Sequence, residues 1–278
     1  MSRGAQILIV VLLVAVVAMG GLLIARRPSG GSRPSAVSGS VVVYAPCGLQ
    51  GPIQMAASAF RKQHPEFPLE VVYDNANVLV RRVLKQGERP DVFISPGELE
   101  LSQVEEAKLL DAASVRDFGT LDMVLIAPAK NTSLKSIEDL TDPKVAAVAL
   151  GDPKFNSVGH YGEQVLRTRK VWEAVQPKLI LREFPLEAFN LVAQNQVQAG
   201  LAYLTCPLDT APEKADKQSV RIVEKISRDS YGPIRLQLGM LNTSKQQEAA
   251  RAFIGFMESP AAQQVMASNG VLPIGGSR

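Results

Sequence analysis

The stretch "VVVYAPCGLQGPI", Val41 to Ile53, decides the fold, because it joins a buried strand directly to the start of a helix. Its run of β-branched residues predicts a strand covered on both faces. The proline and glycine that follow predict a turn, and Cys47 lies on that turn. Such a strand-to-helix turn presents backbone N–H groups that can bind a ligand.

The same alternation of strand and helix continues after this stretch. Short apolar runs bounded by turn residues predict strands at 40–45, 69–74 and 90–95, and amphipathic segments predict helices at 49–66 and 77–87. This order is typical of an α/β fold with a mostly parallel sheet and helices on both faces. Ligands of such sheets bind beyond the carboxyl ends of the strands, which is where Cys47 is expected.

A second α/β unit follows a long apolar strand at 121–128. Further strands are predicted at 145–152, 178–184 and 199–205, with helices at 159–176 and 185–196. A last strand at 234–244 and one helix at 245–270 are interpreted as a return into the first unit. The predicted lobes are 41–122 with 236–278, and 123–235. Two lobes crossed twice by the chain predict a cleft with a hinge.

The N-terminus predicts export from the cytoplasm. After a tip at 1–5, residues 6–25 are apolar and uncharged, which is long enough to span a bilayer and longer than the apolar part of a usual signal peptide. We therefore expect a transmembrane anchor, with a signal peptide cut near Ala18 or Ala25 as the alternative. Residues 26–40 are rich in Gly, Pro and Ser, as in a linker. The folded part is then periplasmic or extracytoplasmic.

The composition agrees with a sizeable folded protein. The chain has 278 residues, of which 46% are hydrophobic and 21% charged, enough for two lobes with buried cores. Its 30 basic and 27 acidic residues leave a net charge of +3. Since no basic block or stacking motif accompanies this balance, nucleic acid is not an expected partner.

Several motifs resemble one known family. "DVFISPG" (91–97), "LIAP" (125–128), "GDPKFNSVGHYGEQVL" (151–166) and "AGLAY" (199–203) occur in the order and spacing of the periplasmic molybdate- and tungstate-binding proteins. The resemblance implies a two-lobe Venus-flytrap receptor of the type II class. Such a receptor holds a small inorganic oxyanion by neutral hydrogen bonds and delivers it to the membrane permease of an ABC importer. It implies neither an enzyme nor a required cofactor.

The resemblance also implies positions for the ligand. The family's two serine hydroxyls fall on Gly48 and Ala76, so both hydroxyl donors are absent here. Its backbone donors fall on Val158 and near Pro185, which has no N–H, so Leu186 takes that place. Its tyrosine is kept as Tyr203. With their neighbours, the predicted ligand-binding residues are Cys47, Gly48, Asn75, Ala76, Asn77, Val158, Leu186 and Tyr203.

The two cysteines leave three interpretations open. In the family's fold Cys47 and Cys206 face the cleft, with His160 on the helix start opposite. In an exported protein the two cysteines can form a disulfide, or they can remain separate thiols. Alternatively, thiolates of Cys47 and Cys206 with His160 can bind a soft ion such as Cu(I) or Zn. Reduction separates these alternatives, because it breaks a disulfide and creates a thiolate site.

Two further hypotheses complete the analysis. A thiol-dependent enzyme using Cys47 is the alternative to a binding protein, although no C-x-x-C pair or recognisable Ser, His and Asp arrangement supports it. The charged stretch "ELELSQVEEAK", 98–108, is interpreted as a solvated helical face.

Overall fold

The computed structural model describes residues 39–208 and 219–274, which belong to one compact unit, Val37–Arg278. The predicted tip at 1–5, the apolar segment at 6–25 and most of the linker at 26–40 lie outside the described residues. Within the described ranges, no helix is both long and apolar enough to cross a membrane.

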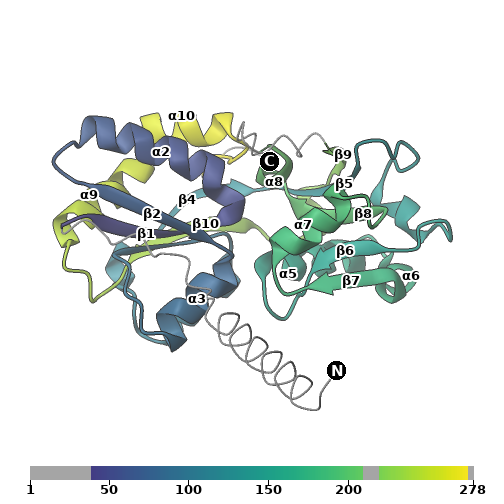
Figure 1. The fold of residues 1–278 in the computed structure, drawn as a ribbon, viewed down its shortest axis with the longest axis horizontal. Coiled ribbons are helices and arrows are strands. Elements are labelled where there is room, and N and C mark those ends of the chain that lie inside the picture. Colours follow the sequence, from purple (N-terminus) through teal and green to yellow (C-terminus); the bar gives the residue numbers. More distant parts are fainter. Residues whose placement is uncertain (1–38, 209–218, 275–278) are drawn as a thin grey trace, which may run out of the picture. The chain divides into compact units, whose positions relative to one another are not determined.

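Two five-stranded sheets, each with helices on both faces, form two lobes (Figure 1). The first sheet has the order β2-β1-β3-β10-β4. Its strands are β1 (Val41–Pro46), β2 (Leu69–Asp74), β3 (Val92–Ser95), β4 (Arg116–Leu121) and β10 (Ile234–Met240), and the first lobe's helices are α2 (Gln50–Gln63), α3 (Ala76–Lys85), α4 (Glu98–Glu106), α9 (Gln247–Met257) and α10 (Pro260–Ser268). The expectation of an α/β two-lobe fold is therefore confirmed.

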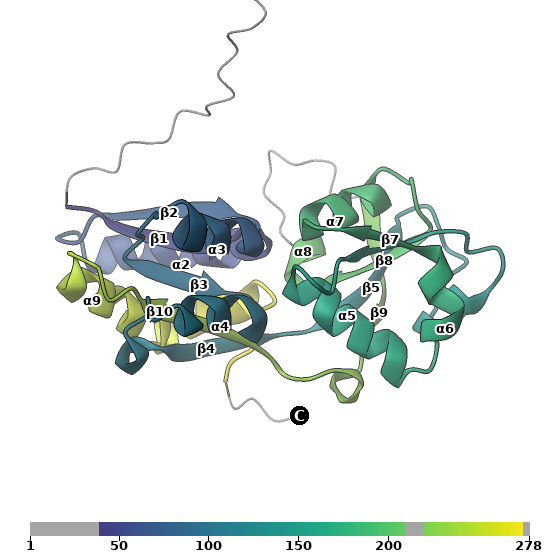
Figure 2. The ribbon, with the colours of Figure 1, turned by 90° about the horizontal axis from the view of Figure 1, so that it is seen from below.

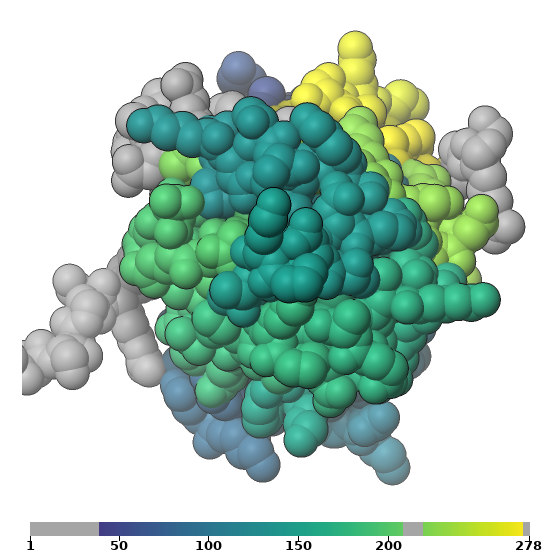
Figure 3. Space-filling view, turned by 90° about the vertical axis from the view of Figure 1, so that its right-hand side faces the viewer, coloured from purple at the N-terminus to yellow at the C-terminus, as the bar shows by residue number. Residues whose placement is uncertain are grey.

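The second sheet has the order β7-β6-β8-β5-β9. Its strands are β5 (Met123–Pro128), β6 (Val148–Gly151), β7 (Leu179–Arg182), β8 (Ala199–Tyr203) and β9 (Val220–Lys225), and the second lobe's helices are α5 (Ser157–Thr168), α6 (Trp172–Val175), α7 (Pro185–Ala193) and α8 (Thr205–Leu208). Short 3-10 turns join the elements at η1 (Cys47–Leu49), η2 (Ala112–Ser114), η3 (Ile137–Thr141), η4 (Gln176–Lys178) and η6 (Arg228–Ser230). Teal and green segments of this lobe cover most of the face in Figure 3.

Strand β1 shows why the first sheet is buried on both sides. Val41, Val43 and Ala45 pack in one core cluster with residues of α2, α9 and α10. Tyr44 packs in another cluster, with residues of α3 and α4. Because side chains alternate between the faces of a strand, a strand covered by helices on both sides needs an apolar run. Figure 2 shows α3 and α4 against this sheet.

The sheets are mixed rather than mostly parallel. In the first sheet β1 pairs parallel with β2 and β3, whereas β10 runs antiparallel to β3 and β4. The antiparallel pair arises because β4 leads into the second lobe and β10 returns from it. Hydrogen bonds join the two chain segments that cross between the lobes. Arg228 donates to Asp122 at 2.7 Å, and the Met123 N–H donates to the Tyr231 hydroxyl at 3.1 Å.

Two predicted helices differ from the structure, and two observed strands were not predicted. The single helix at 245–270 is two helices, because Ser259 caps a new helix at Pro260 and accepts the Ala262 N–H. The helix at 159–176 ends at Thr168, and Lys170 follows with a left-handed φ of 59°. Strands β4 and β9 have no counterpart in the sequence prediction, although they pair with β10 and β5.

Candidate functional site

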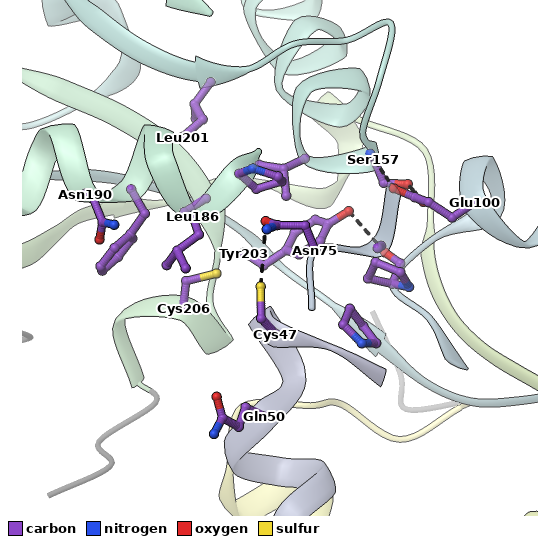
Figure 4. Close-up of a pocket in the computed structure, with 18 of the residues that line it drawn as sticks. Cys47, Gln50, Asn75, Glu100, Ser157, Leu186, Asn190, Leu201, Tyr203 and Cys206 are labelled. Carbon is purple, nitrogen blue, oxygen red and sulfur yellow. Dashed lines mark hydrogen bonds between the residues drawn. The ribbon is translucent and has the colours of Figure 1, made fainter. Parts of the chain in front are cut away.

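A cavity of about 370 Å³ lies between the lobes, where helix N-termini from both lobes meet (Figure 4). The first lobe contributes η1 running into α2, and α3; the second contributes α5 and α7. The predicted helices at 49–66, 77–87, 159–176 and 185–196 begin within two residues of the observed starts of α2, α3, α5 and α7. The lining residues are Pro46, Cys47, Gly48, Gln50, Asn75, Ala76, Pro96, Glu100, Ser157, Val158, Pro185, Leu186, Phe189, Asn190, Ala193, Leu201, Ala202, Tyr203 and Cys206.

Most of the predicted ligand-binding residues lie in this lining. The exception is Asn77, whose side-chain amide instead donates to the Glu183 carbonyl oxygen at 3.1 Å. Next to it, Arg81 donates to the Glu183 carboxylate at 2.6 Å. These two bonds connect α3 of the first lobe with the β7–α7 turn of the second. Asn77 is therefore placed to hold the lobes together rather than to line the cavity.

The first turns of these helices present N–H groups to the cavity. The first four N–H groups of a helix have no partner within the helix. No side chain caps η1, α3 or α7. At α5, the Asn156 side chain accepts the Gly159 N–H at 2.8 Å, and Glu100 accepts the Ser157 N–H at 2.9 Å. Val158, which lies between these two occupied donors, lines the cavity.

Glu100 is a site residue that the sequence analysis missed. Its side chain is 1% exposed, so the interpretation of 98–108 as a solvated face is wrong for this residue. Ser157 donates its hydroxyl and its N–H to the two carboxylate oxygens. Burial raises the pKa of Glu100, and the two hydrogen bonds from Ser157 offset part of that rise.

Helical periodicity is the signal that could have found Glu100. Leu101 and Val104 are buried on α4, and position 100 lies on the same side of that helix. Close packing of α4 on α5 requires Gly97, because a Cβ at that position would lie 2.9 Å from the Ser157 hydroxyl oxygen. The hydrogen-bonded pair of Glu100 and Ser157 therefore links the two lobes through one buried carboxylate.

Tyr203 closes one side of the cavity. Its hydroxyl donates to the Pro96 carbonyl oxygen at 3.1 Å, across the two lobes. Burial raises the pKa of Tyr203 well above its ordinary value, and the Glu100 carboxylate adds to the shift. The phenol therefore stays protonated and acts as a hydrogen-bond donor.

Cys47 and Cys206 line the cavity from opposite lobes (Figure 4). The Cys47 thiol donates to the Asn75 side-chain oxygen at 3.8 Å, and a Cβ built on Gly48 would lie 3.6 Å from the Cys206 sulfur. Both residues are thiols rather than a disulfide in the structure. The disulfide, the separate thiols and the shared thiolate site remain predictions.

His160 does not join the cysteines. It lies on the exposed side of α5, where its Nε2 pairs with the Gln164 amide at 2.9 Å. The hydrogen bond to Gln164, one turn further along α5, holds the imidazole at the exposed surface, whereas Ser157 and Val158 line the cavity. Across residues 39–208 and 219–274, no three His, Cys, Asp or Glu side chains are grouped to hold a metal ion.

Comparisons with known proteins agree with this fold. The profile of a family described as bacterial extracellular solute-binding protein matches residues 41–272. The molybdate-binding protein ModA of Haemophilus influenzae is 24% identical over 239 residues, covering 84% of this chain and 91% of that protein.

Two solved structures have the same two-lobe fold. The periplasmic molybdate-binding protein of Azotobacter vinelandii superposes with a TM-score of 0.71 at 17% identity, covering 84% of this chain and 99% of that one. The sulfate-binding protein SubI of Mycobacterium tuberculosis superposes with a TM-score of 0.70 at 18% identity, covering 85% of this chain and 88% of that one.

Proposed function

Because the chain belongs to the bacterial extracellular solute-binding proteins, we propose that it is the extracytoplasmic receptor of an ABC-type importer, with an oxyanion as its ligand. The ligand binds in the cavity between the lobes and is passed to a membrane permease. The observation that carries the proposal is the convergence of four helix N-termini on one cavity.

The chemistry of the cavity suits an oxyanion held by neutral donors. Helix N-termini carry partial positive charge and N–H groups that point at the ligand. Within the described residues, the lining includes no lysine, arginine or histidine. Helix dipoles and hydrogen bonds would therefore balance the negative charge of the anion. Val158 and Leu186 from one lobe and Gly48 and Ala76 from the other are the proposed backbone donors.

Molybdate and tungstate are the first candidate ligands, since ModA of Haemophilus influenzae is named for molybdate. This chain has Gly48 and Ala76 where the resemblance implies serine hydroxyls. Each missing neutral hydrogen bond costs about 0.5–1.5 kcal/mol, so two of them weaken binding by about 5- to 150-fold.

Titration calorimetry tests this proposal. Molybdate, tungstate, sulfate and phosphate are titrated into the chain starting at Ser40, and we expect stoichiometric binding of at least one of them. Binding should also close the lobes and reduce the radius of gyration in small-angle scattering, because the ligand contacts both sides of the cleft. The absence of heat and of closure with every oxyanion at millimolar concentration would overturn the proposal.

The N-terminal segment is proposed to anchor the receptor beside its permease. The apolar length of 6–25 suits a membrane span, and 26–40 suits a flexible tether. In membranes from cells that express the full chain, we expect the protein to resist extraction with alkaline carbonate. A variant that begins at Ser40 behind a cleavable signal is the control and should be released. A soluble mature protein that starts near residue 19 or 26 would contradict the anchor.

A further inference from the structure

The cavity is elongated along one side of α7. Its lining includes Pro185, Leu186, Phe189, Asn190 and Ala193, which recur at the spacing of a single helical face. A rise of ~1.5 Å per residue over these positions gives a length of about 12 Å. The cavity thus continues for two helical turns beyond the helix N-terminus that faces the proposed oxyanion.

The volume also exceeds what a tetrahedral oxyanion fills. The cavity measures about 370 Å³. With ~30 Å³ for each water molecule of the liquid, that is the volume of about twelve waters. A tetrahedral oxyanion has only five heavy atoms. In this ligand-free structure most of the space is thus left for solvent or for another part of the ligand.

The remaining wall is mostly apolar. Leu186, Phe189 and Leu201 line it from the second lobe, Ala193 follows two helical turns after the start of α7, and Asn190 is its polar residue. Leu186 is 48% exposed, although it is a large hydrophobic residue next to the helix start. Covering such a side chain with apolar ligand atoms is favourable, whereas covering it with an inorganic anion is not.

We infer that the ligand is an oxyanion carried on an apolar chain, such as a phosphonate, phosphate ester or sulfonate with an alkyl tail. This inference rests on the proposed function, because the anionic head occupies the same helix N-termini. The tail extends along α7 between Leu186 and Ala193. The helix ends thus select the charge, and the apolar wall selects the chain length.

A chain-length series tests the inference. Methyl-, butyl-, hexyl- and octylphosphonate are compared with phosphate and molybdate by titration calorimetry. Each buried methylene is expected to increase the affinity about fourfold until the tail reaches Ala193, and longer chains should gain nothing more. If phosphate or molybdate binds and longer tails bind no better than methylphosphonate, the inference is wrong while the proposed function stands. If no oxyanion binds at all, both are wrong.

Ala193→Leu locates the tail. The larger side chain shortens the space along α7, so the gain with chain length should stop at a shorter phosphonate than in the wild type. Gln194→Leu is the matched control, because Gln194 is adjacent, exposed and outside the lining. An equal chain-length limit in both variants and the wild type would place the tail elsewhere and overturn the inference. The wild-type series remains decisive if the Ala193→Leu variant fails to fold.

Discussion

Gly48→Ser combined with Ala76→Ser is expected to raise the affinity for molybdate by about 5- to 150-fold. Each serine adds one neutral hydroxyl donor at a helix start, and each such bond contributes about 0.5–1.5 kcal/mol. The new Cβ at position 48 fits, because it would contact the Cys206 sulfur at an ordinary 3.6 Å. Titration calorimetry with the wild type and the double variant measures the change.

Gly48→Ala is the matched control for this gain. It adds the same Cβ without a hydroxyl, so its affinity should stay close to that of the wild type. Gly255→Ser tests for an effect of serine in general, because a Cβ there meets nothing within 4 Å. Equal affinities for the serine double variant and Gly48→Ala would mean that position 48 does not face the anion.

Glu100→Gln is expected to raise oxyanion affinity at high pH by about 30-fold for each negative charge on the anion, and to abolish the pH dependence of binding. The Glu100 carboxylate is buried in the cavity wall, so it repels a bound anion. At a separation on the order of 8 Å and an effective dielectric constant of ~20, that repulsion is about 2 kcal/mol for each anionic charge. Glutamine removes the charge and keeps the shape.

The sign of the pH dependence follows from linkage. Burial already raises the pKa of Glu100 above the ordinary 4.5, and a bound anion raises it further. Binding therefore takes up a proton. Wild-type affinity should be highest below the pKa of Glu100 in the ligand-free protein. It should fall, by at most tenfold per pH unit, as the pH rises through that pKa. Above the pKa of Glu100 in the complex, the affinity should be constant and low.

Sulfate is a suitable ligand for this measurement, because it does not titrate between pH 5 and pH 9. Glu105→Gln is the control, since Glu105 is an exposed residue of the same helix. It should retain the wild-type pH profile. A Glu100→Gln variant with the same decline in affinity as the wild type would show that another group, or none in the cavity, controls binding.

The two strands that the sequence predicted best are the first two of the first lobe. Strand β2 matches its predicted bounds, and β1 is shifted by one residue, because their apolar runs and flanking turn residues are local signals. The four helix starts at the cavity were equally predictable. The break at Pro260 was missed, although a serine followed by proline is a local helix-start signal.

The sequence by itself determined the alternation of strands and helices and the two lobes, because periodicity and turn chemistry act over a few residues. The predicted positions in the cavity lining came from the family resemblance. Only the tertiary structure decided that Glu100 is buried against Ser157 and that His160 faces away from the two cysteines. These outcomes depend on how α4 and α5 pack across the two lobes. Residues that are distant in sequence meet there through packing geometry, which no local pattern encodes.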